Sequence, residues 1–140
     1  MRRTNDSTLR MLLLVGLMSA ALSAGAALAD EAKPADAKKT EIPAAAKAEG
    51  EQIWTTRCAL CHGAGGKGDG VAGAALNPKP RDMTDKKWQT SVDDARIETA
   101  IVKGGQAVGL SPLMAANPDL EGKPDVVRAL RAKVRSLGAK

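Results

Sequence analysis

The strongest constraint on this chain is the motif CALCH at residues 58–62, which holds both cysteines and the only histidine. On a helix, the thiols of Cys58 and Cys61 lie one turn apart and share a face. Each thiol can add to a vinyl group of one haem, while the adjacent His62 offers a ring nitrogen to the iron. This spacing is the pattern of covalent haem attachment. We therefore expect Cys58 and Cys61 to hold one haem c and His62 to ligate its iron.

Three other kinds of site share part of this pattern. A thioredoxin-like redox pair also uses Cys-x-x-Cys, but there the pair follows a buried strand, and the preceding segment GEQIWTTR (50–57) has no strand pattern. A structural zinc site takes four Cys or His ligands, whereas this chain has three in total. A disulfide across two intervening residues would close a strained loop. These comparisons favour haem.

The N-terminal segment predicts export. Two arginines near the start, an apolar run over 11–28 and Ala-Leu-Ala at 27–29 are typical of a secretory signal peptide. We assign it to residues 1–29 and expect a periplasmic protein. The apolar run is nearly long enough to span a bilayer, so a membrane anchor facing the periplasm is the alternative. Cleavage is favoured because the second half of the run is Ala, Ser and Gly rather than Leu and Ile.

The remaining chain divides into a linker and one domain. Residues 30–47 are rich in Ala, Lys, Glu and Pro, a composition that predicts a flexible linker, and residues 48–140 form the predicted domain. Without residues 1–29 the chain loses three arginines and one aspartate, so its net charge falls from +5 to +3. This balance lacks the clustered basic stripe of nucleic-acid-binding proteins. We expect no nucleic-acid partner.

The apolar periodicity predicts an all-α domain of about three to four helices. The first predicted helix covers about 48–57, with Gly50, Ile53 and Trp54 on one face. A second begins at Ser91 as N-cap, ends at Gly104 as C-cap, and turns Ile97 and Ile101 to one side. The last runs over 124–137, with an apolar face made by Val127, Leu130, Val134 and Leu137.

Long loops separate these helices. The Gly and Pro content of residues 63–80 predicts a flexible loop, and residues 105–122 follow the same pattern. Loops of this length are uncommon in small domains without a functional reason. The chain also has no Phe or Tyr and only two Trp, although aromatic side chains usually supply much of a small core. One haem, wrapped by the loops, accounts for both features.

The second axial ligand can be sought by elimination. With His62 as the only histidine, ligation by two histidines of one chain is excluded. Beyond the signal peptide the chain has two methionines, Met83 and Met114. Met83 lies 21 residues after His62, whereas Met114 ends the loop segment GLSPLM (109–114). Position favours Met114, and Met83 remains the alternative.

From about residue 48 to 137 the chain resembles the class I c-type cytochromes, the single-haem cytochrome c family. The matching residues are Gly50, Trp54, CALCHG at 58–63, GKGDG at 66–70, NPKPRD at 77–82, Ile97, Ile101, the two glycines at 104–105, SPLM at 111–114 and VRSL at 134–137. The resemblance implies a small cytochrome c-like fold around one covalent haem, with Met114 as axial ligand. It also implies that Trp54 lies where the first and last helices cross. The last helix, LRAK at 130–133, lacks the aromatic residue that members often carry there.

Secondary roles follow from the same comparison. The resemblance implies that the carbonyl of Pro78 accepts a hydrogen bond from His62, because a ligating histidine usually donates its second N–H. Arg81 and Trp88 are candidates to bind the haem propionates. The alternative for Arg81 is a side chain that is simply solvated, and the alternative for Trp88 is a role in the core.

A haem with His and Met axial ligands has no open position for substrate, and this ligation raises the reduction potential. We therefore predict a periplasmic single-electron carrier rather than an enzyme, monomeric outside any complex, that docks on donor and acceptor redox proteins. Candidate docking charges are Lys67, Lys79, Lys86, Lys87 and Lys103. Two alternatives stay open: the haem c subunit of a specific dehydrogenase or other oxidoreductase complex, and a haem that binds or senses a ligand at a vacant sixth position.

Overall fold

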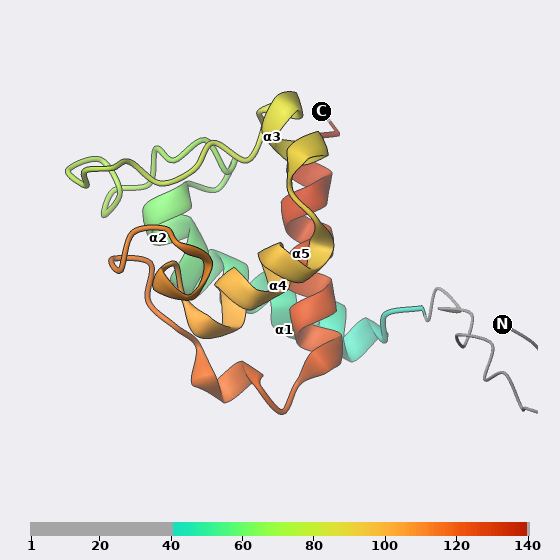
Figure 1. Ribbon diagram of the computed structural model, residues 1–140. Coiled ribbons are helices and arrows are strands. Elements are labelled where there is room, and N and C mark those ends of the chain that lie inside the picture. Colours follow the sequence, from blue (N-terminus) through green and yellow to red (C-terminus); the bar gives the residue numbers. More distant parts are fainter. Residues whose placement is uncertain (1–40, 140) are drawn as a thin grey trace, which may run out of the picture. The chain divides into compact units, whose positions relative to one another are not determined.

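The structure, a computed structural model, describes residues 41–139. The predicted signal peptide and residues 30–40 of the predicted linker lie outside the described residues. Within 41–139 every regular element is helical and there is no strand, which confirms the all-α prediction (Figure 1). The elements are α1 (Ala44–Ile53), the π-helical turn η1 (Trp54–Cys58), α2 (Ala59–His62), α3 (Lys86–Ser91), α4 (Asp94–Lys103), the 3-10 turns η2 (Gln106–Val108) and η3 (Pro118–Leu120), and α5 (Pro124–Leu137).

The elements α1, η1 and α2 follow one another without a break, so the described residues contain four helical segments in addition to the two 3-10 turns. In η1 the hydrogen-bond pattern widens, and the N–H of Ala59 donates to the carbonyl of Trp54, five residues back. Single π-helical turns of this kind are frequent at functional sites. This one ends at Cys58, the first cysteine of the motif.

The first helix begins earlier than predicted. It starts at Ala44, directly after Pro43, so residues 44–47 of the predicted flexible linker are helical. Alanine is the strongest helix former, and Ala46 is buried in the core with 7% of its surface exposed. The composition suggested disorder, but packing of this turn against the core favours the helix.

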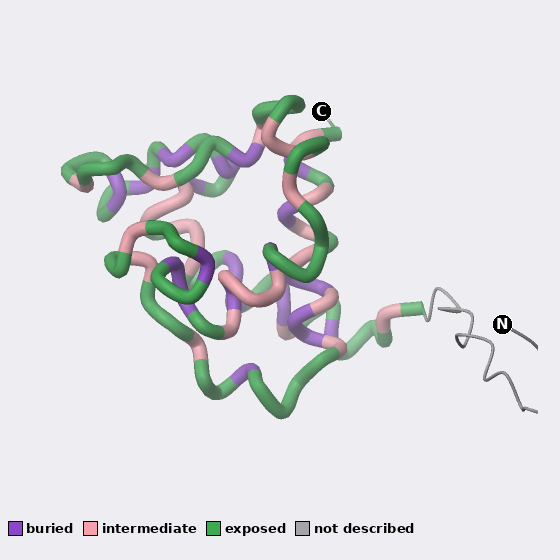
Figure 2. Tube along the Cα trace, in the orientation of Figure 1, coloured by how far each residue is buried: buried purple, intermediate pink, exposed green. Residues whose placement is uncertain are grey.

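The core lies where α1 and α4 pack against α5 (Figures 1 and 2). Trp54 is 3% exposed and Leu130 is 1% exposed. The predicted apolar face of the last helix is confirmed, because Val127, Leu130, Val134 and Leu137 are all buried. No aromatic residue is needed on α5 at this crossing. Leu130 is buried there, and Lys133 Nζ lies 5.9 Å from the centroid of the Trp54 ring.

The helix α4 begins two residues later than its predicted cap would place it. The N-cap is Asp93, whose side chain accepts a hydrogen bond from the N–H of Arg96 at 2.6 Å, and not Ser91. Ser91 instead ends α3, where its hydroxyl donates to the carbonyl of Trp88. Asp and Ser are both good N-caps. Because Ser91 is the last residue of α3, it cannot also cap α4, and Asp93 takes that role. The predicted end at Gly104 is confirmed.

The helix α3 was not predicted. Its N-cap is Asp85, whose carboxylate accepts from the N–H of Lys87 at 2.8 Å. From α3 the side chain of Gln89 donates to the carbonyls of Met83 at 2.7 Å and Val134 at 2.9 Å. These contacts fix α3 between the end of the first long loop and α5. None of the helices in 41–139 is both long and apolar enough to cross a bilayer.

Candidate functional site

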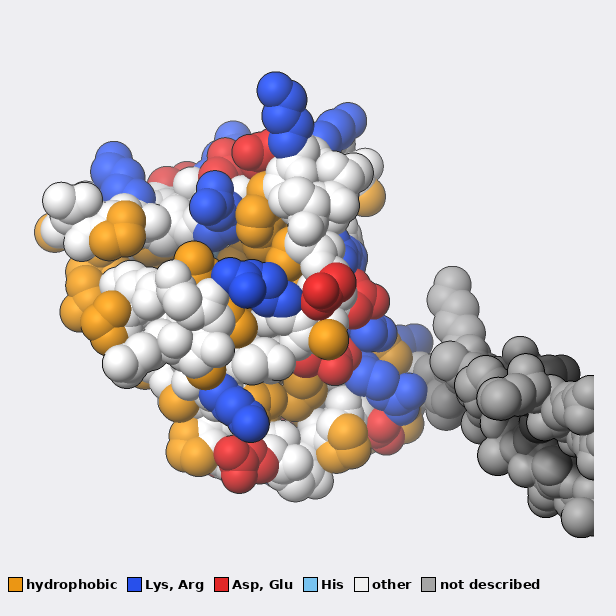
Figure 3. Space-filling model, viewed as in Figure 1, with side chains coloured by type: hydrophobic (Ala, Val, Ile, Leu, Met, Phe, Trp, Pro, Cys, Tyr) orange, Lys and Arg blue, Asp and Glu red, His pale blue; other side chains and the backbone are white. Residues whose placement is uncertain are grey.

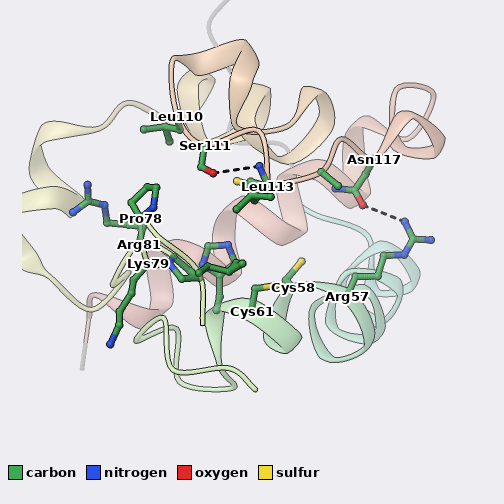
Figure 4. Close-up of a pocket in the computed structure, with 15 residues that line it drawn as sticks. Arg57, Cys58, Cys61, Pro78, Lys79, Arg81, Leu110, Ser111, Leu113 and Asn117 are labelled. Carbon is green, nitrogen blue, oxygen red and sulfur yellow. Dashed lines mark hydrogen bonds between the residues drawn. The ribbon is translucent and has the colours of Figure 1, made fainter. Parts of the chain in front are cut away.

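The four residues predicted for the site lie around one cavity. Cys58, Cys61, His62 and Met114 all line a cavity of about 330 Å³. Figure 4 shows Cys58 and Cys61 on one side and Leu110, Ser111 and Leu113 on the other. The rest of the lining is mainly apolar, with Leu76, Pro78 and Pro80 from the first long loop.

A second cavity, of about 260 Å³, shares lining residues with the first. His62 and Met114 line both cavities. The second is bounded by Trp88 from α3 and by Ile97 and Ile101 from α4. Most of the lining of the second cavity is apolar and two arginines reach it, so the lining suits an apolar group with negatively charged edges.

The Gly-rich loop that begins at Gly63 holds the cysteine motif through backbone hydrogen bonds. Carbonyls at the end of α2 have no partner within the helix. The loop supplies the donors: Ala72 N to Leu60 O at 2.8 Å, Gly70 N to Cys61 O at 3.2 Å and Gly68 N to His62 O at 2.9 Å. A Cβ on Gly70 would collide with the Leu60 carbonyl oxygen, so this approach requires glycine. The predicted flexible loop is therefore held against the motif by its backbone.

The ring of His62 has an unsatisfied buried nitrogen. Its Nδ1 is buried and has no hydrogen-bond partner, which is rare in folded proteins. Burial lowers the pKa of His62, and the backbone of Arg81 opposes part of this effect. A lowered pKa favours the neutral imidazole, which is the form that ligates metals. The residues present therefore fit a haem whose iron is bound by this ring.

The hydrogen bond implied between His62 and the carbonyl of Pro78 is not formed. Pro78 lines the first cavity, but Nδ1 of His62 has no partner.

Both cysteines are free thiols and half-buried. Burial raises the pKa of the Cys58 thiol, and the positive charge of the neighbouring Arg57 opposes part of the rise. The net effect favours the protonated form of Cys58.

The two candidate methionines have different surroundings. Met114 is half-buried and lines both cavities. Met83 is 7% exposed, belongs to the hydrophobic core and lines only the second cavity. The Met114 segment packs closely on Gly105, whose N–H donates to the Met114 carbonyl at 2.9 Å. A Cβ on Gly105 would collide with the carbonyl of Ser111.

Two arginines line the second cavity, one from the loop that precedes α3 and one from α4. Arg81 and Trp88, the predicted propionate candidates, both line it. So does Arg96 of α4, which the sequence interpretation missed, and whose Nη2 donates to the carbonyl of Val108 at 2.6 Å. The sequence signal that could have pointed to Arg96 is that it directly precedes Ile97, a residue of the predicted buried face of this helix. Two guanidinium groups in one cavity suit a ligand with carboxylate groups.

Four large apolar side chains are exposed, and two of them, Leu110 and Leu113, line the first cavity. Leu60, Leu110 and Leu113 are about half exposed, and Val71 is 88% exposed. In the space-filling view, hydrophobic side chains gather on the side where the first long loop and the 105–117 segment lie (Figure 3). All five predicted docking lysines are exposed. Of these, only Lys79 lines the first cavity.

Comparison with known proteins places these features in a family. Residues 47–130 match the cytochrome c family. The chain is 34% identical over 91 residues to the cbb3-type cytochrome c oxidase subunit FixP of Bradyrhizobium diazoefficiens, covering 65% of this chain and 27% of that protein. It is also 34% identical over 98 residues to the FixP subunit of Azorhizobium caulinodans, covering 70% of this chain and 29% of that protein. The chain thus spans less than a third of the length of these relatives.

Proposed function

Since the chain belongs to the cytochrome c family, whose members carry covalent haem c and transfer electrons, we propose that it is a periplasmic single-electron carrier. In this proposal Cys58 and Cys61 hold the haem, and His62 and Met114 are its axial ligands. The observation that supports it most is that these four residues line one cavity. The periplasmic location rests on the predicted signal peptide, residues 1–29.

The haem iron supplies reversible transfer of one electron when bound. The residues of the chain determine its setting. Cys58 and Cys61 would hold the haem through thioether bonds, each S–H adding across one vinyl group, and Met114 together with His62 would ligate the iron and leave no open site for substrate. The buried side chains of Ile97 and Ile101 line the second cavity and would limit the contact of the haem with water, and Met/His ligation raises the potential. We assign the propionates to Arg81, Trp88 and Arg96, and the support for this is that all three line the second cavity.

Docking of redox partners is proposed at the mouth of the first cavity. Lys79 lines this cavity and is exposed. The neighbouring apolar residues Leu110 and Leu113 are also exposed. A partner with an apolar contact surface and acidic residues at its rim would match this arrangement.

The ligation can be tested by removing each methionine from the holoprotein. Met114→Ala should abolish the Met–iron absorption band of the oxidised form, while the covalent haem stays attached. Met83→Ala is the matched control and should keep the band, although burial of Met83 predicts a loss of stability. A band lost in Met83→Ala and kept in Met114→Ala would overturn the assignment.

A second candidate function has a specific observation in its favour. Both relatives named above are subunits of a cbb3-type cytochrome c oxidase. We propose as the alternative that this chain is the haem c subunit of an oxidoreductase complex. Gel filtration of the native protein in moderate salt separates the two. A partner that stays bound would favour the subunit, whereas elution as a monomer would favour the free carrier.

A further inference from the structure

One polar contact joins the segment that carries the cysteines to the segment that carries Met114. Arg57 directly precedes Cys58, and its Nη1 donates to the two carboxylate oxygens of Asp119 at 2.9 and 3.0 Å. The same nitrogen lies 3.4 Å from Asn117 Oδ1. Arg57 and Asn117 line the same cavity as Cys58 and Met114. Figure 4 shows the pair at the Cys58 end of that cavity.

This contact has no substitute nearby. Within residues 41–139, the hydrogen bonds of Arg57 are the only ones that connect residues 54–62 with residues 105–120. The two residues between Met114 and Asn117 are exposed alanines, which offer no polar side chain. Among the described residues, all the hydrogen bonds between the Met114 segment and the helix that carries the cysteines are therefore those of Arg57.

Asn117 transmits the contact to α4. Its N–H donates to the carbonyl of Val102 at 2.8 Å, and its Nδ2 donates to the carbonyl of Ile101 at 2.7 Å. These bonds satisfy carbonyls at the end of α4 that lack helical partners. Asn117 is thus anchored on one side to α4 and on the other to Arg57, three residues after Met114.

We propose that Arg57 is a positioning residue that, through Asn117 and Asp119, holds the Met114 segment against the haem-attachment helix and so keeps Met114 on the sixth position. The inference rests on the proposed function, in which Met114 is the axial ligand. When the contact is removed, the segment moves away more often. A small ligand in solution then competes better with Met114 for the sixth position.

The size of the effect follows from exposure. The side chains of Arg57 and Asp119 are each 48% exposed, and pairs of this kind contribute little because water screens them. The contact should therefore shift the competition by about two- to five-fold. The contact changes how easily Met114 is displaced from the iron and does not decide whether Met114 binds it.

The test is an imidazole titration of the oxidised holoprotein. Asp119→Asn removes the charge and keeps the size of the side chain, and it should bind imidazole about two- to five-fold more tightly than the wild type. The matched control is Glu49→Gln, which breaks the ion pair of Glu49 with Lys123 (2.6 Å, 40% and 48% exposed), away from the cavity. This control should bind imidazole as the wild type does. Equal affinity in Asp119→Asn and the wild type, or an equal gain in the control, would overturn the proposal.

A second variant separates positioning from general loosening. Arg57→Gln should bind imidazole at least as tightly as Asp119→Asn, because it removes the contact with Asn117 as well as the one with Asp119. The double variant should show no gain beyond that of Arg57→Gln, because Asp119 acts through Arg57. Additive gains would contradict the proposal. Only covalently loaded protein is compared, since Arg57 precedes Cys58.

Met114→Ala distinguishes failure of this inference from failure of the proposed ligation. If that variant keeps the Met–iron band, the ligation is wrong and the positioning role falls with it. If it loses the band while Asp119→Asn binds imidazole as the wild type does, only the positioning role is wrong.

Discussion

The α1–α5 crossing and the cavity region are stabilised in different ways. At the crossing, side chains such as Trp54 and Leu130 are almost fully buried, and ion pairs such as Lys133 with Glu51 lie at its margin. Around the cavity, two long loops are held mainly by backbone hydrogen bonds, by close approaches at Gly70 and Gly105, and by Arg57. The crossing provides most of the buried apolar area, while the loops provide the site.

This difference teaches that stability and ligation can be changed separately. A substitution at the crossing should lower the free energy of unfolding and leave the haem ligation of the folded protein unchanged. A substitution in the loops should change ligation at a smaller cost in stability.

The largest expected effect is at the crossing. Leu130→Ala should reduce the free energy of unfolding by about 2–5 kcal/mol, because Leu130 is 1% exposed and its removal leaves a cavity. Denaturant unfolding followed by far-UV circular dichroism measures it. Val71→Ala, at 88% exposure, is the control and should change stability by less than about 0.5 kcal/mol. Loss of the Met–iron band in folded Leu130→Ala would show that the two regions are not separable.

The loop behind the cysteine motif gives the next effect. Gly70→Ala should cost about 1–3 kcal/mol, because its methyl group would collide with the Leu60 carbonyl and the loop must shift. Gly65→Ala, in the same loop, meets nothing within 4 Å and should be neutral or slightly stabilising. The same denaturation experiment compares them. Equal stability of the two variants would mean that the loop is not pinned at Gly70.

The Met114 segment tests ligation more than stability. Gly105→Ala should weaken the Met–iron absorption band, because the methyl group would displace Ser111 and press on the Met114 side chain. Gly122→Ala, which meets nothing within 4 Å, should keep the full band. We expect the stability loss of Gly105→Ala to be smaller than that of Leu130→Ala. An unchanged band in Gly105→Ala would contradict the packing described for this segment.

The smallest effect concerns pH. Hydrogen bonds from the hydroxyl and N–H of Thr84 hold the pKa of Asp82 below its usual value. A carboxylate with a lowered folded-state pKa adds stability above its unfolded-state pKa of about 4, and this stability is lost as the pH falls further. The wild type should therefore be slightly more stable than Asp82→Asn at pH 7, and the difference should close below about pH 4.

Denaturant unfolding across this pH range measures the difference. A difference for Asp82→Asn that stays constant with pH would contradict the role of this carboxylate.

Local signals made part of the fold predictable. The bounds of α5 were predicted as observed, since Pro124 suits a first turn and its apolar face has a clear helical period. The six residues of α3 have no such period, and the helix depends on the Asp85 cap and on Gln89 contacts with distant carbonyls. The early start of α1 depends on burial of Ala46, which composition does not show.

The site divides in the same way. The motif at 58–62 carries its chemistry in five consecutive residues, so Cys58, Cys61 and His62 could be found directly. Met114 could be preferred because only two methionines follow residue 29 and because both its position and the family resemblance favour it over Met83. The contact of Arg57 with Asn117 joins residues 60 positions apart, and no local pattern indicates it.

Carbon monoxide added to the reduced protein tests the central claim most directly, because the gas competes for the sixth position. The account predicts that the wild type and Met83→Ala resist binding, while Met114→Ala binds rapidly and completely. Rapid, complete binding by the wild type would contradict stable Met114 ligation and would favour a ligand-binding haem over an electron carrier.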